Sequence, residues 1–148
     1  MFMKKKPREN LASILDLLNQ GLQLEYSLIV HYPRLASAIK DEETRKLALK
    51  LGSDSIRHAD IVAGVISGLG ENPLWSFEAF PEETNLVKVF QVQLEKEKLA
   101  LQLHRQSSDL VLDSSLRDRF RNMAKEEEQH IQIAETILSR LTQDRGSS

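Results

Sequence analysis

The sequence places glutamates and histidines at positions where a helix would turn them inward. Glu25, Glu97 and Glu127 each interrupt a run of apolar residues that recurs at three- and four-residue steps, and so do His58 and His130. An ionised glutamate on such a face is costly to bury unless it is paired or coordinated. We therefore expect these five side chains to converge in the protein interior.

Glu127 and His130 stand three residues apart, so both side chains leave one helix face a turn apart. Three carboxylates that face one another without a cation would repel each other and retain protons. Iron or manganese would neutralise them, and the imidazoles would complete the coordination. The pattern therefore predicts a metal site. Taken singly, each histidine could be a hydrogen-bonded core residue, and each glutamate could reach solvent.

An internal repeat supports this interpretation. In each half of the chain, 33 residues separate the glutamate from the histidine, and a shift of 72 residues superposes the two halves. The polar pairs that this shift superposes are Glu25 with Glu97, His58 with His130, Asp54 with Glu126, and Tyr32 with His104. We expect two copies of one helical hairpin, related by a pseudo-twofold axis.

The apolar periodicity predicts four helices, over about 9–39, 41–69, 84–112 and 114–141. Asp41 and Ser114 are the expected N-caps, and Gly70 is the expected stop of the second helix. Two joints are too short to do more than reverse the chain, whereas residues 71–83 are long enough to cross a bundle. The predicted fold is an all-α, antiparallel four-helix bundle of two hairpins with a long crossover.

Three aromatic residues, Trp75, Phe77 and Phe80, lie in that crossover. We expect them to pack the crossover onto the bundle; the alternative is that they contact a ligand.

Composition excludes several classes of function. The 148 residues suit one domain, with a basic tail at 1–8, the bundle at 9–141 and a second tail at 142–148. Lysine and arginine total 20 against 22 acidic residues, which argues against nucleic acid or an anionic membrane as partner. The absence of cysteine excludes disulfides, iron–sulfur clusters and thiol nucleophiles. Without a long apolar stretch or a secretory signal, a cytoplasmic location is expected.

Over about residues 9–141, the sequence resembles the bacterioferritin and rubrerythrin branch of the ferritin-like superfamily of di-iron carboxylate proteins. The segments that carry the resemblance are Leu24-Glu25 followed by Tyr32, His58-Ala59-Asp60 followed by residues 68–73 (GLGENP), and residues 126–130 (EEEQH). The resemblance implies that Glu25 and His58 hold one metal ion, that Glu97 and His130 hold the other, and that Glu127 bridges them. It also implies that Tyr32 hydrogen-bonds near the site, with His104 as its counterpart at the edge.

One position departs from the family pattern. Ser55 stands where the family has a second bridging glutamate, three residues before the histidine. Asp54 is rotated about 100° around the helix and is not expected to replace it, and Glu126 is expected to face outward in the same way. Three carboxylates leave a formal charge of +1 with two divalent ions, or −1 with one. A working two-metal site, a single-metal site and a purely structural bundle all remain open.

The resemblance also sets expectations for cofactors and activity. We expect non-haem iron, as one or two ions, with manganese or zinc as alternatives. Haem is not expected, because Ile56 stands where bacterioferritins carry a methionine. Ala100 and Leu101 occupy the turn that holds an extra glutamate in rubrerythrins, which weakens a peroxidase assignment.

The expected activity is oxidation of Fe(II) by dioxygen or peroxide, with the oxidant entering beside Ser55. Because the chain ends soon after the fourth helix, a homodimer is expected instead of a storage shell. The alternative is a bundle with a degenerate site that acts through dimerisation or partner binding.

Overall fold

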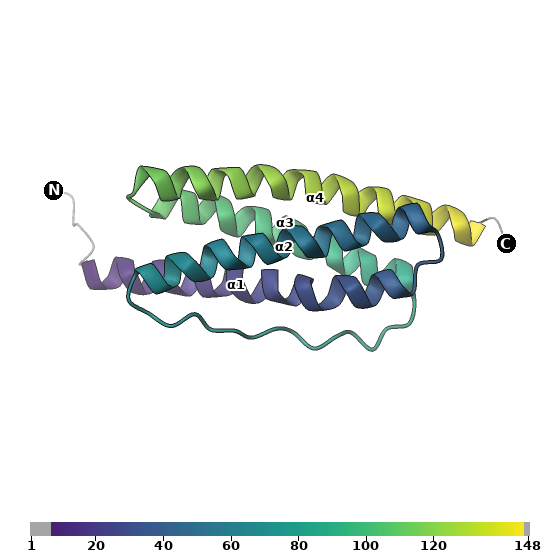
Figure 1. Ribbon diagram of the computed structural model, residues 1–148, viewed down its shortest axis with the longest axis horizontal. Coiled ribbons are helices and arrows are strands. Elements are labelled where there is room, and N and C mark those ends of the chain that lie inside the picture. Colours follow the sequence, from purple (N-terminus) through teal and green to yellow (C-terminus); the bar gives the residue numbers. More distant parts are fainter. Residues whose placement is uncertain (1–6, 147–148) are drawn as a thin grey trace.

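Four long helices form an elongated bundle in the computed structural model, which describes residues 7–146 (Figure 1). They are α1 (Pro7–Ser37), α2 (Glu42–Gly68), α3 (Leu86–Leu110) and α4 (Ser114–Gly146). α1 packs against α2 as one hairpin, and α3 packs against α4 as the other. The connection from α2 to α3 runs along the bundle beside α1. The predicted all-α bundle with a long crossover is confirmed.

Local sequence signals fix the ends of α2. The Asp41 carboxylate accepts a hydrogen bond of 3.0 Å from the backbone N–H of Thr44, so Asp41 is the N-cap that the sequence indicated. Glu42 and Glu43 in the first turn favour the positive end of the helix dipole. Gly70 has a φ of +85°, a conformation that glycine adopts without a steric penalty, and it follows the last turn as predicted.

The cap of α4 differs from the prediction by one residue. The Asp113 carboxylate accepts hydrogen bonds from the backbone N–H groups of Ser115 at 2.7 Å and of Leu116 at 3.1 Å. Asp113 therefore takes the capping role that was expected of Ser114, because its carboxylate reaches two of the unpaired amides of the first turn.

The first and last helices each extend beyond the predicted bounds at one end, although α1 ends at Ser37, before the predicted residue 39. α1 begins at Pro7 and α4 continues to Gly146, so residues assigned to the tails at 1–8 and 142–148 are partly helical. The remaining parts of those tails, residues 1–6 and 147–148, lie outside the described residues.

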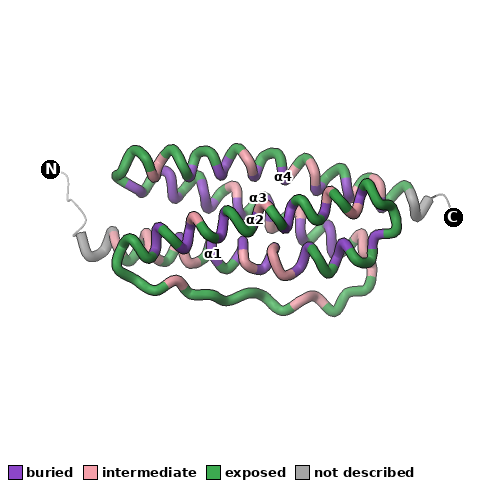
Figure 2. Tube along the Cα trace, viewed as in Figure 1, coloured by how far each residue is buried: buried purple, intermediate pink, exposed green. Residues whose placement is uncertain are grey.

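Two apolar clusters fill the bundle on either side of its middle, and the buried positions follow the inner faces of the helices (Figure 2). The larger side chains of one cluster are Leu28, Tyr32, Leu35, Ile39, Leu51, Phe90, Ile137 and Leu141. The larger side chains of the other are Leu18, Leu22, Ile66, Phe120 and Met123. The polar residues at the middle therefore lie between two apolar clusters along the length of the bundle.

The crossover is attached to α1 by aromatic contacts. The rings of Trp75 and Phe77 approach Tyr26 edge-on, with centroids 5.4 and 5.5 Å away, although both rings remain about half exposed. Phe80 packs against the buried ring of His31. These contacts agree with the packing role that the sequence indicated.

Across residues 7–146, none of the helices has an apolar stretch of the length that a bilayer crossing requires.

Candidate metal centre

All four helices send ionisable side chains into the middle of the bundle. α1 supplies Glu25, α2 supplies His58, α3 supplies Glu97 and His104, and α4 supplies Glu127 and His130. None of these six residues is more than 1% exposed. The five that the sequence singled out do converge, because their matched positions along the helices bring them to one depth. His104, expected at the edge, lies among them.

Glu127 separates two groups of candidate ligand atoms. Its Oε1 lies 2.8 Å from Nδ1 of His58 and 3.8 Å from Nε2 of His104, whereas its Oε2 lies 3.3 Å from Nδ1 of His130. The two oxygens of one carboxylate thus face two different sets of imidazoles. This is the geometry that a bridging carboxylate needs.

We call these sets the four-residue group and the three-residue group. The four-residue group consists of Glu25, His58, His104 and Glu127, and the three-residue group of Glu97, Glu127 and His130; in each, the candidate ligand atoms lie within 4.8 Å of one another. Glu25 Oε1 is 2.9 Å from His104 Nε2 and 3.4 Å from His58 Nδ1. Each group could hold one cation.

Several ligand atoms are buried without a hydrogen-bond partner. Among the described residues, these are Oε2 of Glu25, Glu97 and Glu127, together with Nδ1 of His130. A buried, unsatisfied polar atom costs roughly 1–3 kcal/mol, and more when it is charged. Oxygen and imidazole nitrogen are donors that iron, manganese and zinc accept, so cations placed in the two groups would satisfy these atoms.

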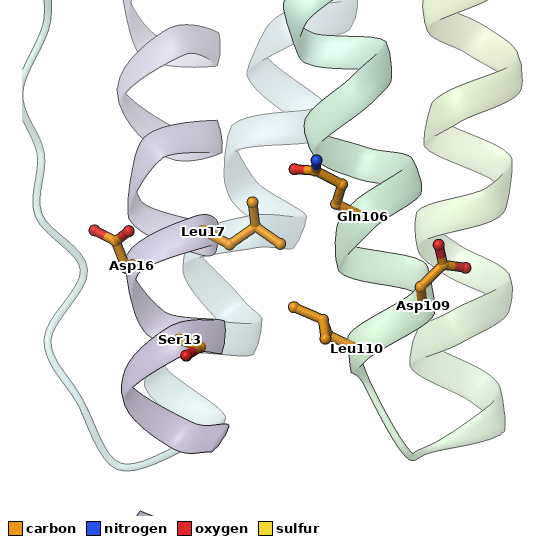
Figure 3. Close-up of a pocket in the computed structure, with 6 residues that line it drawn as sticks. All are labelled: Ser13, Asp16, Leu17, Gln106, Asp109 and Leu110. Atoms are coloured by element: carbon orange, nitrogen blue, oxygen red, sulfur yellow. The ribbon is translucent and has the colours of Figure 1, made fainter. Parts of the chain in front are cut away.

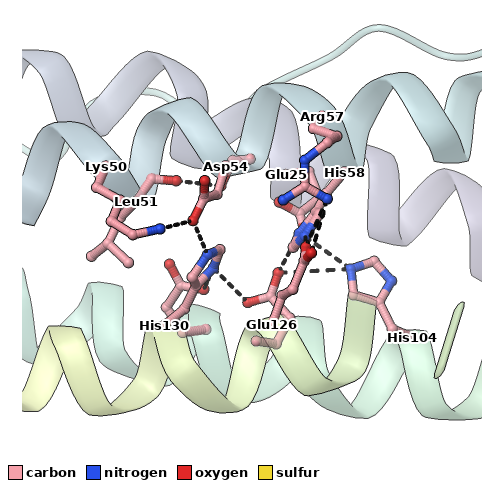
Figure 4. A network of polar contacts seen from close by, with 12 residues as sticks. Glu25, Lys50, Leu51, Asp54, Arg57, His58, His104, Glu126 and His130 are labelled. Carbon is pink, nitrogen blue, oxygen red and sulfur yellow. Dashed lines mark hydrogen bonds and ion pairs between the residues drawn. The ribbon is translucent and has the colours of Figure 1, made fainter. Parts of the chain in front are cut away.

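Carboxylates on the opposite hairpin hold two of the three central histidines, His58 and His130. Nε2 of His58 donates to Oε2 of Glu126 at 2.5 Å, and Nε2 of His130 donates to Oδ2 of Asp54 at 3.0 Å (Figure 4). A carboxylate can only accept, so the nitrogen is the donor in each pair. With the proton fixed on Nε2, the Nδ1 atom of each ring is directed at the centre, as in metal-binding histidines.

The prediction that Asp54 and Glu126 face outward is therefore wrong. Both backbone positions do lie beside the inner face, and their side chains remain 22% and 32% exposed. However, each carboxylate extends across to the neighbouring helix, where it finds an imidazole N–H. Lys50 contacts Asp54 at 2.8 Å and Arg57 contacts Glu126 at 2.9 Å. Asp54 and Glu126 are 72 residues apart, and so are His58 and His130, so the internal repeat relates the two carboxylate–imidazole pairs.

The same symmetry relates Tyr32 and His104. The Tyr32 hydroxyl donates to Oε1 of Glu97 at 2.8 Å, which agrees with the role that the resemblance implied. Nε2 of His104 contacts Glu25, the repeat partner of Glu97, at 2.9 Å. His104 differs from Tyr32 because it also approaches Glu127 and so joins the four-residue group. His104 follows Glu97 by seven residues, or two helical turns, so the sequence already placed both side chains on one face of α3.

Burial and mutual repulsion control the charges of the acidic groups. Burial, followed by the charges of Glu25 and Glu97, raises the pKa of Glu127 well above its usual range. Burial also opposes ionisation of Glu25, but hydrogen bonds from His104 and His58 outweigh it and lower the pKa of that carboxyl. Without a cation, the centre therefore retains protons among its carboxylates.

The same buried charges shift the pKa values of His130 and Tyr32. Burial opposes a positive charge on His130, but its contacts with Glu127 and Glu97 prevail and raise the pKa of His130 to about 10. Burial and the charge of Glu97 raise the pKa of the Tyr32 phenol well above its usual value. The phenol therefore remains protonated and donates to Glu97.

Ser55 is buried one turn before His58 on α2. Its hydroxyl donates to the carbonyl of Leu51 at 3.0 Å, a bond within its own helix. Ser55 thus brings no charge to the centre, and α2 contributes only His58 to the two groups.

A second acidic location lies apart from this centre. An open groove of about 470 Å³ between α1 and α3 is lined by Ser13, Asp16, Leu17, Gln106, Asp109 and Leu110 (Figure 3). None of the centre's residues lines it, and no histidine joins its two carboxylates.

Comparisons with known proteins agree with this fold. A Bacillus anthracis protein described as ferritin-like and diiron-carboxylate is 18% identical, with a TM-score of 0.79 over 87% of this chain and 97% of that one. A dodecameric thioferritin, a bacterioferritin-related protein from Bacteroides fragilis, is 18% identical, with a TM-score of 0.76 over 92% of this chain and 90% of that one. A Desulfovibrio desulfuricans bacterioferritin with a diiron site is 19% identical, with a TM-score of 0.74 over 95% and 86%.

No curated protein matches the sequence significantly. The family model of the ferritin-like domain matches residues 15–143, which is most of the chain. Together with the bundle and its central carboxylates and imidazoles, this match shows that the chain belongs to the ferritin-like domain family.

Proposed function

We propose that this protein binds two non-haem iron ions between its hairpins and oxidises Fe(II). The observation that supports this most directly is Glu127, whose two oxygens face two separate groups of buried ligand atoms. Glu25 and His58 would hold one ion and Glu97 and His130 the other, with Glu127 shared. Iron supplies the one-electron redox chemistry.

The proposed reaction balances as follows. Two Fe(II) ions are the substrate and each loses one electron. One dioxygen takes up both electrons with two protons and leaves as hydrogen peroxide. With peroxide as the oxidant, two electrons and two protons yield two water molecules. Two ions held side by side can deliver both electrons together, which a single ion cannot.

The chain's own residues would position the ions and exclude water. Asp54 and Glu126 fix the imidazoles of His130 and His58, so that Nδ1 of each faces the centre. Tyr32 fixes Glu97 by donating to one of its oxygens. The apolar clusters on either side keep the carboxylates in a low dielectric, where their attraction for cations is strong.

Anaerobic titration with Fe(II), followed by addition of oxygen, tests this proposal. We expect two ions per chain and a rise of Fe(III) absorbance in the near ultraviolet. Glu127→Gln should lower both binding and oxidation, because it removes the shared charge. Glu128→Gln, at the exposed neighbouring position, is the matched control and should change neither. Absence of bound metal in the wild type would favour the structural bundle.

We also propose that the protein forms a homodimer. Leu49 and Ile56 lie seven residues apart on the outer face of α2 and are 45% and 56% exposed, so two large apolar side chains share one exposed helix face. A second copy of α2 would cover them. Analytical ultracentrifugation should give a dimer mass that falls towards the monomer in Leu49→Glu/Ile56→Glu; a monomeric wild type would contradict this.

A further inference from the structure

We propose that His104 is a direct metal ligand and that the centre therefore holds its two ions unequally. The tighter ion would be bound by the four-residue group, and the weaker ion by the three-residue group. This inference rests on the proposed function, since it concerns metal binding at the same centre.

The spacing of the four-residue group fits one tetrahedral cation. Metal–nitrogen and metal–oxygen bonds of about 2.0–2.2 Å place tetrahedral ligand atoms about 3.3–3.6 Å apart. The distances from Oε1 of Glu25 to His104 and His58 are 2.9 and 3.4 Å, and those from Oε1 of Glu127 are 3.8 and 2.8 Å. Each of these four distances lies within about 0.5 Å of the tetrahedral range, and all the ligand atoms of the group lie within 4.8 Å of one another.

A hydrogen bond to Glu25 alone would be the simpler role, because Tyr32 has that role towards Glu97. The two residues differ in what they can offer. An imidazole whose ring proton lies on Nδ1 presents a lone pair at Nε2 and stays neutral, whereas a phenol must lose its proton to bind a metal. Nε2 of His104 also approaches Oε1 of Glu127, the same atom that faces His58. His104 is thus directed at the middle of the group as well as at Glu25.

His104 also restores a ligand that Ser55 does not supply. The Ser55 hydroxyl is bonded to Leu51, so without His104 each ion would have three protein ligands. With His104, one ion has four, the usual number for a closed tetrahedral site. The carboxylates of Glu25 and Glu127 together neutralise that divalent ion. The second ion would gain only Glu97 as a further charge, so it should bind more weakly and exchange faster.

Zinc is a suitable probe, because it has no redox chemistry and prefers tetrahedral nitrogen and oxygen ligands. In the wild type, calorimetric titration should resolve two binding events. X-ray absorption at the zinc edge, on protein loaded with one equivalent, should show two imidazoles. His104→Gln keeps an N–H donor for Glu25 but removes the imidazole. It should leave one imidazole on the first ion and lower its affinity by more than about 100-fold, which is the upper end of what the loss of an outer hydrogen-bond partner causes.

Two further variants keep the test decisive. His31→Gln alters the one histidine outside the centre, so it should leave both the affinity and the imidazole count unchanged. His130→Gln should lower the affinity for the second zinc ion only and should leave two imidazoles on the first.

A single imidazole on the first zinc in the wild type would overturn the inference, as would a count that His104→Gln leaves unchanged. If two ions still bind in that case, the proposed function survives. If the wild type binds no zinc or iron, both proposals fail.

Discussion

Substitution of Ser55 by glutamate tests whether this position faces the metal centre. Ser55 is fully buried, one turn before His58, and is the repeat counterpart of Glu127. A glutamate here would place a fourth carboxylate beside Glu25, Glu97 and Glu127. With two divalent ions bound, the centre of the variant would be formally neutral, whereas the wild-type centre with two such ions would have a formal charge of +1.

The expected destabilisation without metal follows from the charge. A buried carboxyl that must stay protonated at pH 7, against an ordinary pKa of about 4.3, costs at most about 3.7 kcal/mol. Crowding by the larger side chain adds roughly 1–3 kcal/mol. For a chain of this length, a loss of this size lowers the melting temperature by roughly 10 °C or more.

Metal should reverse this effect. Cations displace the proton and use the new carboxylate as a ligand, so the metal-induced rise in melting temperature should exceed that of the wild type by roughly 10 °C or more. Thermal melts with and without Fe(II), under anaerobic conditions, measure both shifts. Ser53→Glu, at an exposed position on the same helix, is the matched control and should respond like the wild type. Equal metal-induced shifts in Ser55→Glu and the wild type would show that position 55 does not face the centre.

Three further predictions concern residues around the centre. Glu126→Gln should lower affinity for the first ion by roughly 10–100-fold, because the imidazole of His58 loses its charged partner; chelator competition measures this, and an unchanged affinity would contradict it. Burial lowers the pKa of His31 below its ordinary value of about 6.5, so its contribution to stability is present above pH 6.5 and lost as pH falls below it. The free energy of unfolding, measured by urea melts, should therefore fall less steeply from pH 7 to pH 5 in His31→Gln than in the wild type. Equal slopes against pH in the two proteins would exclude this role. Gly52→Ala should lower the free energy of unfolding by about 1–3 kcal/mol, since its new Cβ would lie 3.1 Å from Cβ of Tyr32 on α1. Gly64→Ala has open space around it and should raise the free energy of unfolding by roughly 0.5–1 kcal/mol. Equal effects of the two substitutions in urea melts would refute the close contact between α1 and α2.

The sequence by itself was sufficient for the helices and for the five central residues. A helix repeats every 3.6 residues, so apolar positions at three- and four-residue steps define one face, and any polar residue on that face must point inward. The 33-residue interval in both halves then placed Glu25 and His58 at the same depth as Glu97 and His130. These conclusions depend only on where the Cβ atoms point.

The tertiary structure decided where the ends of the longer side chains lie. Asp54 and Glu126 are beside the inner face, yet their carboxylates reach imidazoles on the opposite hairpin. Likewise, only the distance between α3 and α4 brings His104 near Glu127. A position on a helix fixes the direction of Cβ, whereas several rotatable bonds and the spacing between helices determine where the polar end of the side chain finds its partner.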